Sequence, residues 1–433
     1  MGGRYDQWML KAVDLRGCGL DVASLLPAPS DPGSGVSDAV AEIIEDVRNR
    51  GDAALRELTE RFDGPDLASP RVDRREIEAA RARIPASLRA ALETAFQRIV
   101  EYHAHEAAPL DPFRSDGIVV EHRDVAVERA GCYAPGGRAR YPSSVLMCAA
   151  PARVAGVGEI VLCVPPAADG HIDDATLAAA AIAGVDEVYA VGGAQAIAAM
   201  ALGTDAIRRV DVLVGPGNAY VAEAKRQLSG IVGVASAFAG PSEIVVIADA
   251  TTPPRLAAID LMVQAEHGPD GMAWLVTWDE DTAAAVDASL EELIAAAPRR
   301  QDLEATMASN GICCLVDDAR QAMAVSNIVA PEHLELLVEN FGLLAADVRA
   351  AGAVFCGIDA PASLGDYAAG PNHILPTNRS ARFSSALRAD DFRRHIHIVE
   401  VSPAGFDAIA PIVIELATAE GLSAHAESIR MRR

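Results

Sequence analysis

The chain has 433 residues, of which 51% are hydrophobic and 23% are charged. This composition can bury large cores and is not that of a disordered protein, and the length allows roughly two to four domains. The net charge of −24 gives an acidic surface that repels nucleic acid and anionic lipid, which excludes both as main partners.

The cysteines and the apolar runs indicate a cytoplasmic protein. Seven cysteines are scattered along the chain without a CxxC pair, which favours a reducing compartment and argues against a disulfide framework. The first residues lack the apolar core of a signal peptide, and no uninterrupted apolar run is long enough to span a membrane.

The segment from residue 36 to residue 105 has the apolar periodicity of several amphipathic helices, broken at Pro85. His103 and His105 near its end are two positions apart, so they lie on different faces of a helix. We therefore expect exposed polar histidines there and no metal pair.

From residue 111 onwards, strand-like pieces replace the helical pattern. EIVLCV, DEVYAVG and DVLVGPG are each followed by a turn and a helix, which predicts βα repetition and a parallel sheet covered on both faces. A second block of the same kind follows from SEIVVIAD to GAVFCGID. We predict an α/β protein with two Rossmann-like parallel-sheet units, one inserted in the other. The predicted divisions are an N-terminal segment (1–23), a first α/β domain (24–132 and 242–387), an inserted domain (133–241) and a C-terminal tail (388–433).

Three glycine-containing turns are candidates for ligand binding, because open parallel sheets bind ligands at the carboxyl ends of their strands. Val191–Ala196 and Val214–Tyr220 place glycines before a helix N-terminus, which suits a phosphate, and Gln195 and Asn218 there could contact a nucleotide. Neither is a full GxGxxG with an acidic residue twenty positions on, so glycines that only permit tight turns remain an equal alternative. AGPSE is the third turn, with Ser242 at a strand start.

The stretch IDLMVQAEHG reads as the end of a helix stopped by Gly268-Pro269. Gln264 and His267 are three apart and lie on one face, where an amide oxygen and an imidazole nitrogen could hold part of the shell of a zinc-like ion. The alternative is a histidine that only interacts with the helix dipole.

The stretch APEHLEL is predicted to start a helix with Pro331 at its first position. The helix N-terminus would keep Glu332 ionised and His333 neutral, which makes both possible bases. The alternative is ordinary first-turn glutamate chemistry beside a structural histidine.

Two further regions carry candidate polar residues. The loop SLGDYAAGPNHILPT holds Asp366 and His373 among glycines and prolines, which favours function over mere connection. The tail brings Glu420 and His425. His395 and His397 alternate with apolar residues and would share one side of a strand, where surface positions are favoured over a metal site.

Several long motifs in the same order resemble the histidinol dehydrogenase family, zinc enzymes of histidine biosynthesis. They are YAPGGRARYPSSVLM, VGGAQAIAA, DVLVGPGNAYVAEAK, AGPSE, QAEHGPD, APEHLEL, GDYAAGPNHILPT and ARFSS, and the similarity runs from VDLRG to SAHAES. The resemblance implies NAD-linked oxidation of L-histidinol to L-histidine by way of L-histidinal.

The resemblance also implies a homodimer with one Zn²⁺ per subunit, whose tail (388–433) docks on the partner and completes the active site. The implied metal ligands are Gln264, His267, Asp366 and His425, and the implied bases are Glu332 and His333. The implied substrate contacts are Ser242, Gln264, His267, His333, Asp366, His373, Glu420 and His425. The implied nucleotide contacts are Tyr133, Gln195 and Asn218.

The sequence departs from the family pattern at three places. Ser236 stands where an aspartate is expected, Asn378-Arg379-Ser380 replaces glycines after LPT, and the tail RRHIHIVEV is atypical. None removes a ligand or base, but each leaves room for a paralogue that oxidises another amino alcohol or polyol. A zinc hydrolase in which Glu332 activates metal-bound water, or a metal-dependent binding protein, are alternatives of other classes.

Overall fold

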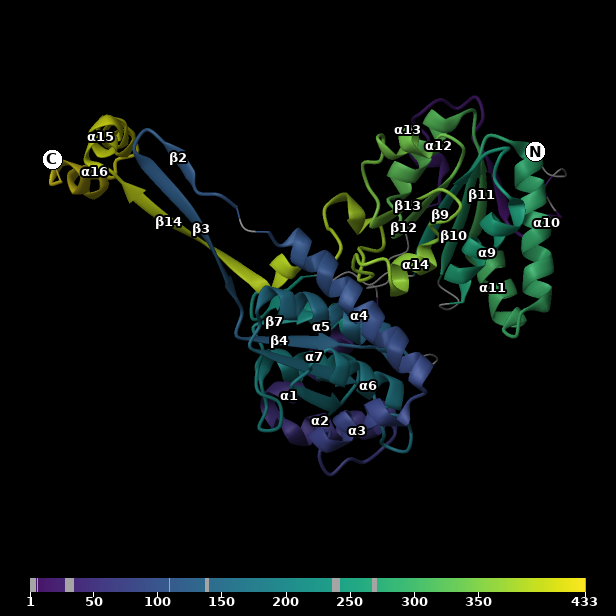
Figure 1. The fold of residues 1–433 in the computed structure, drawn as a ribbon, viewed down its shortest axis with the longest axis horizontal. Helices are drawn as coiled ribbons and strands as arrows, with labels where there is room; N and C mark the ends of the chain where they lie inside the picture. Colours follow the sequence, from purple (N-terminus) through teal and green to yellow (C-terminus); the bar gives the residue numbers. More distant parts are fainter. Residues whose placement is uncertain are drawn as a thin grey trace.

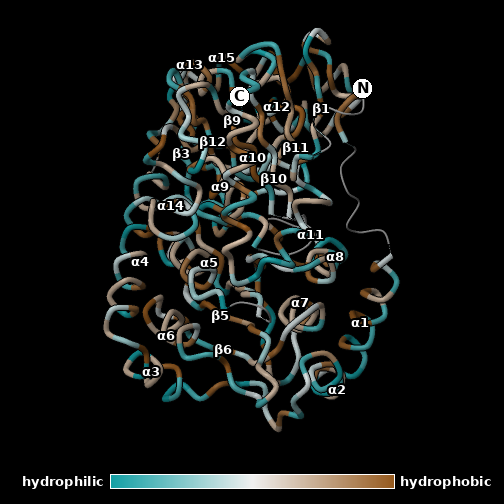
Figure 2. The backbone as a smooth tube through the Cα atoms, turned by 90° about the vertical axis from the view of Figure 1, so that its right-hand side faces the viewer, coloured by the Kyte–Doolittle hydropathy of each residue, from teal (hydrophilic) through white to brown (hydrophobic). Residues whose placement is uncertain are grey.

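A computed structural model describes residues 5, 7–27, 35–108, 110–136, 140–235, 242–266 and 271–432. Figure 1 shows two α/β bodies and a long arm that extends away from both. In Figure 2 the two bodies lie one above the other. None of the described helices is long and apolar enough to cross a membrane.

The six-stranded unit is built on a wholly parallel sheet with strand order β1-β11-β10-β9-β12-β13. Its strands are buried apolar runs such as EIVVIA and GICCL, as expected of a parallel sheet covered on both faces. The strands are β1 (Lys11–Asp14), β9 (Glu243–Ala248), β10 (Met272–Thr277), β11 (Gly311–Leu315), β12 (His333–Leu337) and β13 (Ala353–Cys356). The helices are α9 (Pro254–Ala265), α10 (Glu280–Ala296), α11 (Arg300–Asn310), α12 (Ala319–Val329), α13 (Phe341–Ala345) and α14 (Ala362–Tyr367), with short 3-10 turns at Ala23–Leu25 and Ser380–Arg382.

The five-stranded unit has a second parallel sheet, with strand order β6-β5-β4-β7-β8. Its strands are β4 (Arg129–Tyr133), β5 (Glu159–Val164), β6 (Glu187–Ala190), β7 (Val212–Val214) and β8 (Gly233–Val234). Its inner helices are α5 (Pro142–Ala155), α6 (Asp174–Ile182), α7 (Gly193–Leu202) and α8 (Ala219–Leu228). Four earlier helices cover it: α1 (Ser37–Arg50), α2 (Asp52–Asp63), α3 (Arg74–Arg83) and α4 (Ala86–Glu106).

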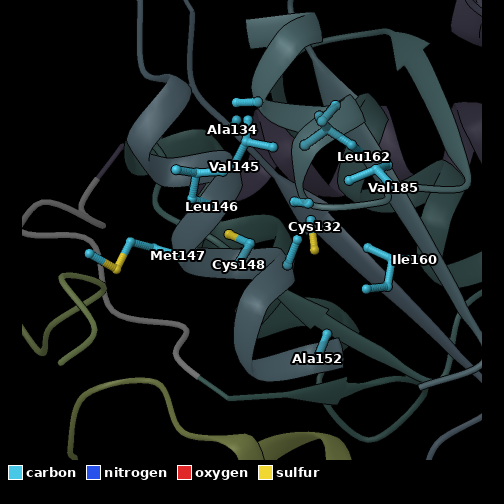
Figure 3. Close-up of a cluster of buried hydrophobic side chains, with 14 of the residues drawn as sticks. Cys132, Ala134, Val145, Leu146, Met147, Cys148, Ala152, Ile160, Leu162 and Val185 are labelled. Carbon is cyan, nitrogen blue, oxygen red and sulfur yellow. The ribbon is translucent and has the colours of Figure 1, made fainter. Parts of the chain in front are cut away.

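Helix α5 is the centre of this unit's core. It is apolar almost all round and buried along most of its length, because one face contacts the sheet and the other contacts α4 and α6. Figure 3 shows Val145, Leu146 and Cys148 of α5 beside Cys132 of β4 and Leu162 of β5.

The expected assignment of residues 24–132 to the same domain as 242–387 is wrong for helices α1 to α4. Ile77, Leu92 and Ile99 share one core with α5, and Val40 and Leu55 share another with α7. Sequence order misled here because an amphipathic helix does not specify which sheet it covers. His103 is also buried, not exposed as expected: its Nδ1 lies 3.1 Å from Glu106 Oε2.

The arm is a three-stranded antiparallel ribbon that ends in two helices (Figure 1). Strand β14 (Arg393–Val401), preceded by a 3-10 turn at Ala389–Phe392, pairs along its whole length with β3 (Ile118–Ala126), which also pairs with β2 (Phe113–Ser115). Helices α15 (Pro403–Ala419) and α16 (Ser423–Arg430) contact one another at the far end. The tail is therefore anchored through β14 to a strand of its own chain.

Candidate active site

Buried polar residues gather at the amino edge of the six-stranded sheet. Glu243 and His333 are the first residues of the adjacent parallel strands β9 and β12, and Gln264 lies near the end of α9. Ser242 precedes β9 at the same edge, where its carbonyl accepts a hydrogen bond from Met272. This cluster is thus at the opposite end of its sheet from the carboxyl edge at which AGPSE was expected.

The predicted helix at Pro331–His333 is absent, because His333–Leu337 is the buried strand β12. Helix α12 ends at Val329, and Ala330 turns the chain with a left-handed backbone (φ 49°). HLELL is a short apolar run bordered by proline, a pattern that fits a buried strand as well as a helix.

The imidazole of His333 is surrounded by polar groups. Nδ1 lies 3.2 Å from the carbonyl oxygen of Glu243, 3.4 Å from Nε2 of Gln264 and 3.7 Å from Oε2 of Glu332. Nε2 lies 3.4 Å from Oδ1 of Asp366 without the alignment of a hydrogen bond. A proton on Nδ1 that is donated to the Glu243 carbonyl leaves Nε2 as the atom that can take up a further proton.

Burial and neighbouring carboxylates set the charges in this cluster. Burial raises the pKa of Glu332 to about 7, although the charge of His333 opposes the shift. Burial lowers the pKa of His333, but the carboxylates of Glu332 and Asp366 outweigh it and raise the pKa to about 9. In the absence of a metal ion these pKa shifts favour a charged imidazole, whereas the helix N-terminus expected from the sequence favours a neutral one.

Glu243 belongs to the cluster although sequence reasoning passed over it. Its N–H donates to Glu332 Oε2 at 3.0 Å, and its own Oε1 accepts from the N–H of Asn378 at 2.9 Å. Burial and the charge of Glu332 raise its pKa to about 8. The available signal was a glutamate opening the otherwise apolar strand EIVVIA.

Asp366 lies on helix α14 and not in a loop as expected, and the loop after this helix, which carries His373, is held by the five-stranded unit. His373 Nδ1 lies 2.7 Å from the carbonyl oxygen of Asp366, and its Nε2 lies 3.3 Å from Ser144 Oγ on α5. Asn372 donates to the Met147 carbonyl at 2.7 Å and lies 3.3 Å from Nε2 of the buried His103. Ser144, Asn372 and His103 were not predicted, since their role depends on contacts between the two units.

The donor set partly fits a metal ion. Oε1 of Gln264 is buried without a hydrogen-bond partner among the described residues, and the Asp366 carboxylate faces the same imidazole as Gln264. Unpaired buried oxygen and a nearby carboxylate suit a cation that takes oxygen and nitrogen ligands. Among the described residues no three His, Cys, Asp or Glu side chains already surround a common metal position. His267 lies outside the described residues.

Glu420 and His425 are not near this cluster. Both are exposed, on or beside α16, and Figure 1 places α16 at the far end of the arm from α14. The structure therefore brings together Gln264, Glu332, His333, Asp366 and His373, but not the two tail residues.

A second site lies at the carboxyl edge of the five-stranded sheet. A cavity of about 1130 Å³ is lined by residues at or after the ends of β4, β5, β6 and β7, including Tyr133, Gln195 and Asn218, and by residues of α1 and α2. The Tyr133 hydroxyl accepts from the N–H of Gly193 at 3.0 Å, and Asn218 caps α8 by accepting from Val221 N at 3.1 Å. Gln195 is buried, and its Nε2 has no partner within the described part of the chain.

The turn before Asn218 is held in place by a buried lysine and a close backbone contact. The buried Lys225 ammonium donates to the carbonyl of Gly215. A side chain at position 215 would overlap the carbonyl oxygen of Tyr133, so only glycine permits this approach of the two strand ends. Burial lowers the pKa of Lys225 to about 8.

Comparisons with known proteins give the family. A profile of the histidinol dehydrogenase family matches residues 28–433. A histidinol dehydrogenase of Chromobacterium violaceum is 47% identical over 401 residues, which cover 92% of each chain. One of Gluconobacter oxydans is 45% identical over 98% of this chain and 99% of its own length. The chain belongs to the histidinol dehydrogenase family.

A solved structure extends the likeness to the fold. The crystal structure of histidinol dehydrogenase from Elizabethkingia anophelis matches with a TM-score of 0.94 and 34% identity over 98% of both chains. The predicted resemblance and the predicted α/β class with two parallel sheets are both confirmed. Membership of the histidinol dehydrogenase family makes the chain an oxidoreductase of the dehydrogenase type.

Proposed function

We propose that this enzyme oxidises L-histidinol to L-histidine through L-histidinal, with NAD as the electron acceptor and Zn²⁺ as a resident metal, in histidine biosynthesis in the cytoplasm. The names of the relatives support the reaction. The observation that carries the proposal is the buried His333, set between the carboxylates of Glu332 and Asp366 and beside Gln264.

His333 is the base for the alcohol proton. Its Nδ1 faces the Glu243 carbonyl, so Nε2 is the position that accepts a proton from substrate. Glu332 is the second base, which activates a water molecule for addition to the aldehyde. Its pKa near 7 suits a general base at neutral pH.

The proposed metal ligands are Gln264, His267, Asp366 and His425. The proposed substrate contacts are these four residues together with Ser242, His333, His373 and Glu420. When bound, Zn²⁺ supplies a positive charge that orients the amine and imidazole nitrogens of the substrate and counteracts the charge of Asp366 on His333. His373 has a fixed position for a substrate contact, because Ser144 and the Asp366 carbonyl hold both of its ring nitrogens.

The arm requires a second subunit in this proposal. Large apolar side chains on the ribbon and on α15 are exposed, among them Val399 (59%), Ile412 (58%) and Leu416 (60%). Apolar surface of this kind is unusual on a monomer and is typical of an interface. We propose a homodimer in which each arm docks on the partner and delivers Glu420 and His425 to the partner's site.

The cavity of the five-stranded unit is the proposed NAD site, with Tyr133, Gln195 and Asn218 as contacts. NAD supplies the hydride acceptor for both oxidation steps. The carboxyl-edge position of these residues agrees with the general rule for dinucleotides on open parallel sheets.

The test is NAD reduction followed at its absorbance with L-histidinol as substrate, with and without a chelator. We expect two NADH per histidinol, loss of turnover in the chelator and recovery on adding Zn²⁺. L-histidinol should be preferred over amino alcohols that lack the imidazole. No NAD reduction by metal-loaded enzyme would reject the proposal, and equal rates with imidazole-free amino alcohols would reject the substrate.

A further inference from the structure

The topology of the five-stranded sheet fixes how a dinucleotide lies across it. The chain runs from β4 to β5 and β6 on one side and then crosses to β7 on the other. The point where strand order reverses is therefore between β4 and β7, where Tyr133 and Asn218 lie. Dinucleotides cross such a point, with the adenosine half over the second strand, here β5.

The second strand lacks the residue that usually completes such a site. An acidic side chain near its end normally binds the hydroxyls of the adenosine ribose. Here the two residues that follow β5 are Pro165 and Pro166, which have no side-chain acceptor.

Asp63 brings a carboxylate to this place from a different element. It is the last residue of α2, and its Oδ2 accepts from the N–H of Gly192 at 3.3 Å. A side chain on Gly192 would meet Asp63 Oδ1 at 2.9 Å and Pro165 Cγ at 2.7 Å. Asp63, Gly192 and Pro165 therefore meet beside the end of β5, and Asp63 lines the same cavity as Tyr133 and Gln195.

The same contacts oppose a phosphate at this end of the cavity. Gly192 and Gly193, the cap and first residue of α7, donate their N–H groups to Asp63 and to the Tyr133 hydroxyl. The helix N-terminus that suited a phosphate from the sequence already has a carboxylate. The described charged residues of the lining are Arg61 and four carboxylates, those of Glu42, Glu45, Asp46 and Asp63.

We propose that Asp63 is the residue that selects NAD over NADP. Its carboxylate accepts hydrogen bonds from the free ribose hydroxyls and repels a 2′-phosphate. Asp63, on α2, thus takes the role that an acidic residue at the end of the second strand has in other dinucleotide-binding folds. The inference rests on the proposed use of NAD by this enzyme.

The test compares Asp63→Asn with Glu45→Gln in the metal-loaded enzyme. Both changes remove one negative charge from the lining, but the Glu45 side chain is 61% exposed and pairs with Arg48 at 3.0 Å, whereas Asp63 accepts a hydrogen bond from α7. Asparagine keeps an acceptor for the Gly192 N–H. The measurement is kcat/KM for NAD and for NADP at saturating L-histidinol, with thermal unfolding as a check on folding.

We expect the preference for NAD over NADP to fall by roughly tenfold or more in Asp63→Asn, since a phosphate carries up to about two charges. In Glu45→Gln it should change by less than about twofold because exposed charges are screened. Equal falls in both variants, or an unchanged preference in a folded Asp63→Asn enzyme, would overturn the assignment. If Asp63→Asn does not fold, Asp63→Ser keeps an acceptor without charge and decides by the same ratio. If the wild-type enzyme reduces neither NAD nor NADP, the proposed function itself is rejected, and this outcome is distinct from a failure of the Asp63 assignment.

Discussion

The two parallel-sheet units have the same architecture but place their polar sites at opposite edges. In the five-stranded unit Tyr133 ends a strand and Gln195 and Asn218 follow strands, as the carboxyl-edge rule requires. In the six-stranded unit Glu243 and His333 begin their strands. The rule describes sites made by strand–helix turns of one sheet. It does not cover a site closed by a loop that another unit holds, as α5 holds His373.

The units also differ in where the backbone is left-handed at residues other than glycine, and buried polar atoms without hydrogen-bond partners accompany this backbone in the six-stranded unit. At the amino edge of the six-stranded sheet, Glu243 Oε2, Gln264 Oε1 and His333 Nε2 are buried without hydrogen-bond partners among the described residues. Ala330, Asn378 and Arg379, all close in sequence to residues of this edge, have left-handed backbones, whereas no described non-glycine residue of the five-stranded unit does. Such a concentration of unfavourable features is typical of a functional site.

The largest expected effect is on the amino edge alone. Asp366→Asn removes a proposed zinc ligand and one of the two carboxylates beside His333, so we expect turnover to fall by about a thousandfold or more, with bound zinc lost. NAD binding and the unfolding temperature should change little, because the proposed NAD cavity belongs to the other unit. Asp359→Asn, an exposed aspartate before α14, is the control. Full activity of a zinc-free Asp366→Asn enzyme would contradict the proposed site.

The two bases should separate by reaction step. Glu332→Gln should slow oxidation of histidinal by about a hundredfold or more and that of histidinol far less, because only the aldehyde step needs an activated water. His333→Asn should slow both steps. Stopped-flow traces of NADH formation from each substrate distinguish them. If Glu332→Gln oxidised histidinal at the wild-type rate, the water-activating role would belong to another residue, with Glu243 the next candidate.

The sequence predicted the two α/β sheets because each βα unit carries local signals, a buried apolar run and a glycine turn. The predicted residues Gln264, Asp366 and His373 lie in distinctive motifs, and the structure brings them together around His333. The helix predicted at Glu332 failed because five residues such as HLELL have too little periodicity to separate strand from helix. The placement of α1 to α4, the pairing of β3 with β14 and the contact of His103 with Asn372 depend on chain segments far apart in the sequence, which local patterns do not encode.

The arm gives a test of whether the amino-edge site is complete within one chain. A His425→Ala chain and an Asp366→Asn chain are each expected to be inactive. In a mixed dimer one site would combine the intact Asp366 of one chain with the intact His425 of the other. Random exchange should therefore restore about a quarter of wild-type activity, since half of the dimers are mixed and each has one whole site. Confirmed exchange by native mass spectrometry without recovered activity would mean that the tail acts within its own chain.

A smaller effect is expected at the carboxyl edge. Lys225→Met leaves the Gly215 carbonyl without its donor, which loosens the turn before Asn218 and should weaken NAD binding by about tenfold, as loss of one buried hydrogen bond does. The KM for histidinol should not change. Arg226→Met, which removes an exposed partner of Glu223, is the control. A change in histidinol KM as large as that for NAD would mean that the two edges are coupled.

Lys225 also predicts a pH dependence of stability. Burial lowers its pKa to about 8 in the folded protein, so folding disfavours the charged form. The penalty is absent where lysine is neutral in both states, above about pH 10.4, and is complete below pH 8. The free energy of unfolding of the wild type, taken relative to Lys225→Met, should therefore decrease as the pH falls from 10.5 to 8. A flat difference across this interval in denaturant titrations would show that the ammonium is not buried as described.

The smallest effect concerns the backbone of the amino edge. Asn378 (φ 52°) and Arg379 (φ 62°) have left-handed backbones, and the Asn378 N–H donates to Oε1 of Glu243 at 2.9 Å. Asparagine tolerates the left-handed region, but arginine does so at a cost. Arg379→Gly should therefore raise the free energy of unfolding by about 0.5–1 kcal/mol, after loss of its hydrogen bond to the Pro27 carbonyl, and leave turnover unchanged. Arg382→Gly, in the same turn but without a positive φ, should be destabilising instead. If both glycine variants lose stability equally, the left-handed backbone at Arg379 stores no strain, and the contrast in backbone strain between the two units fails.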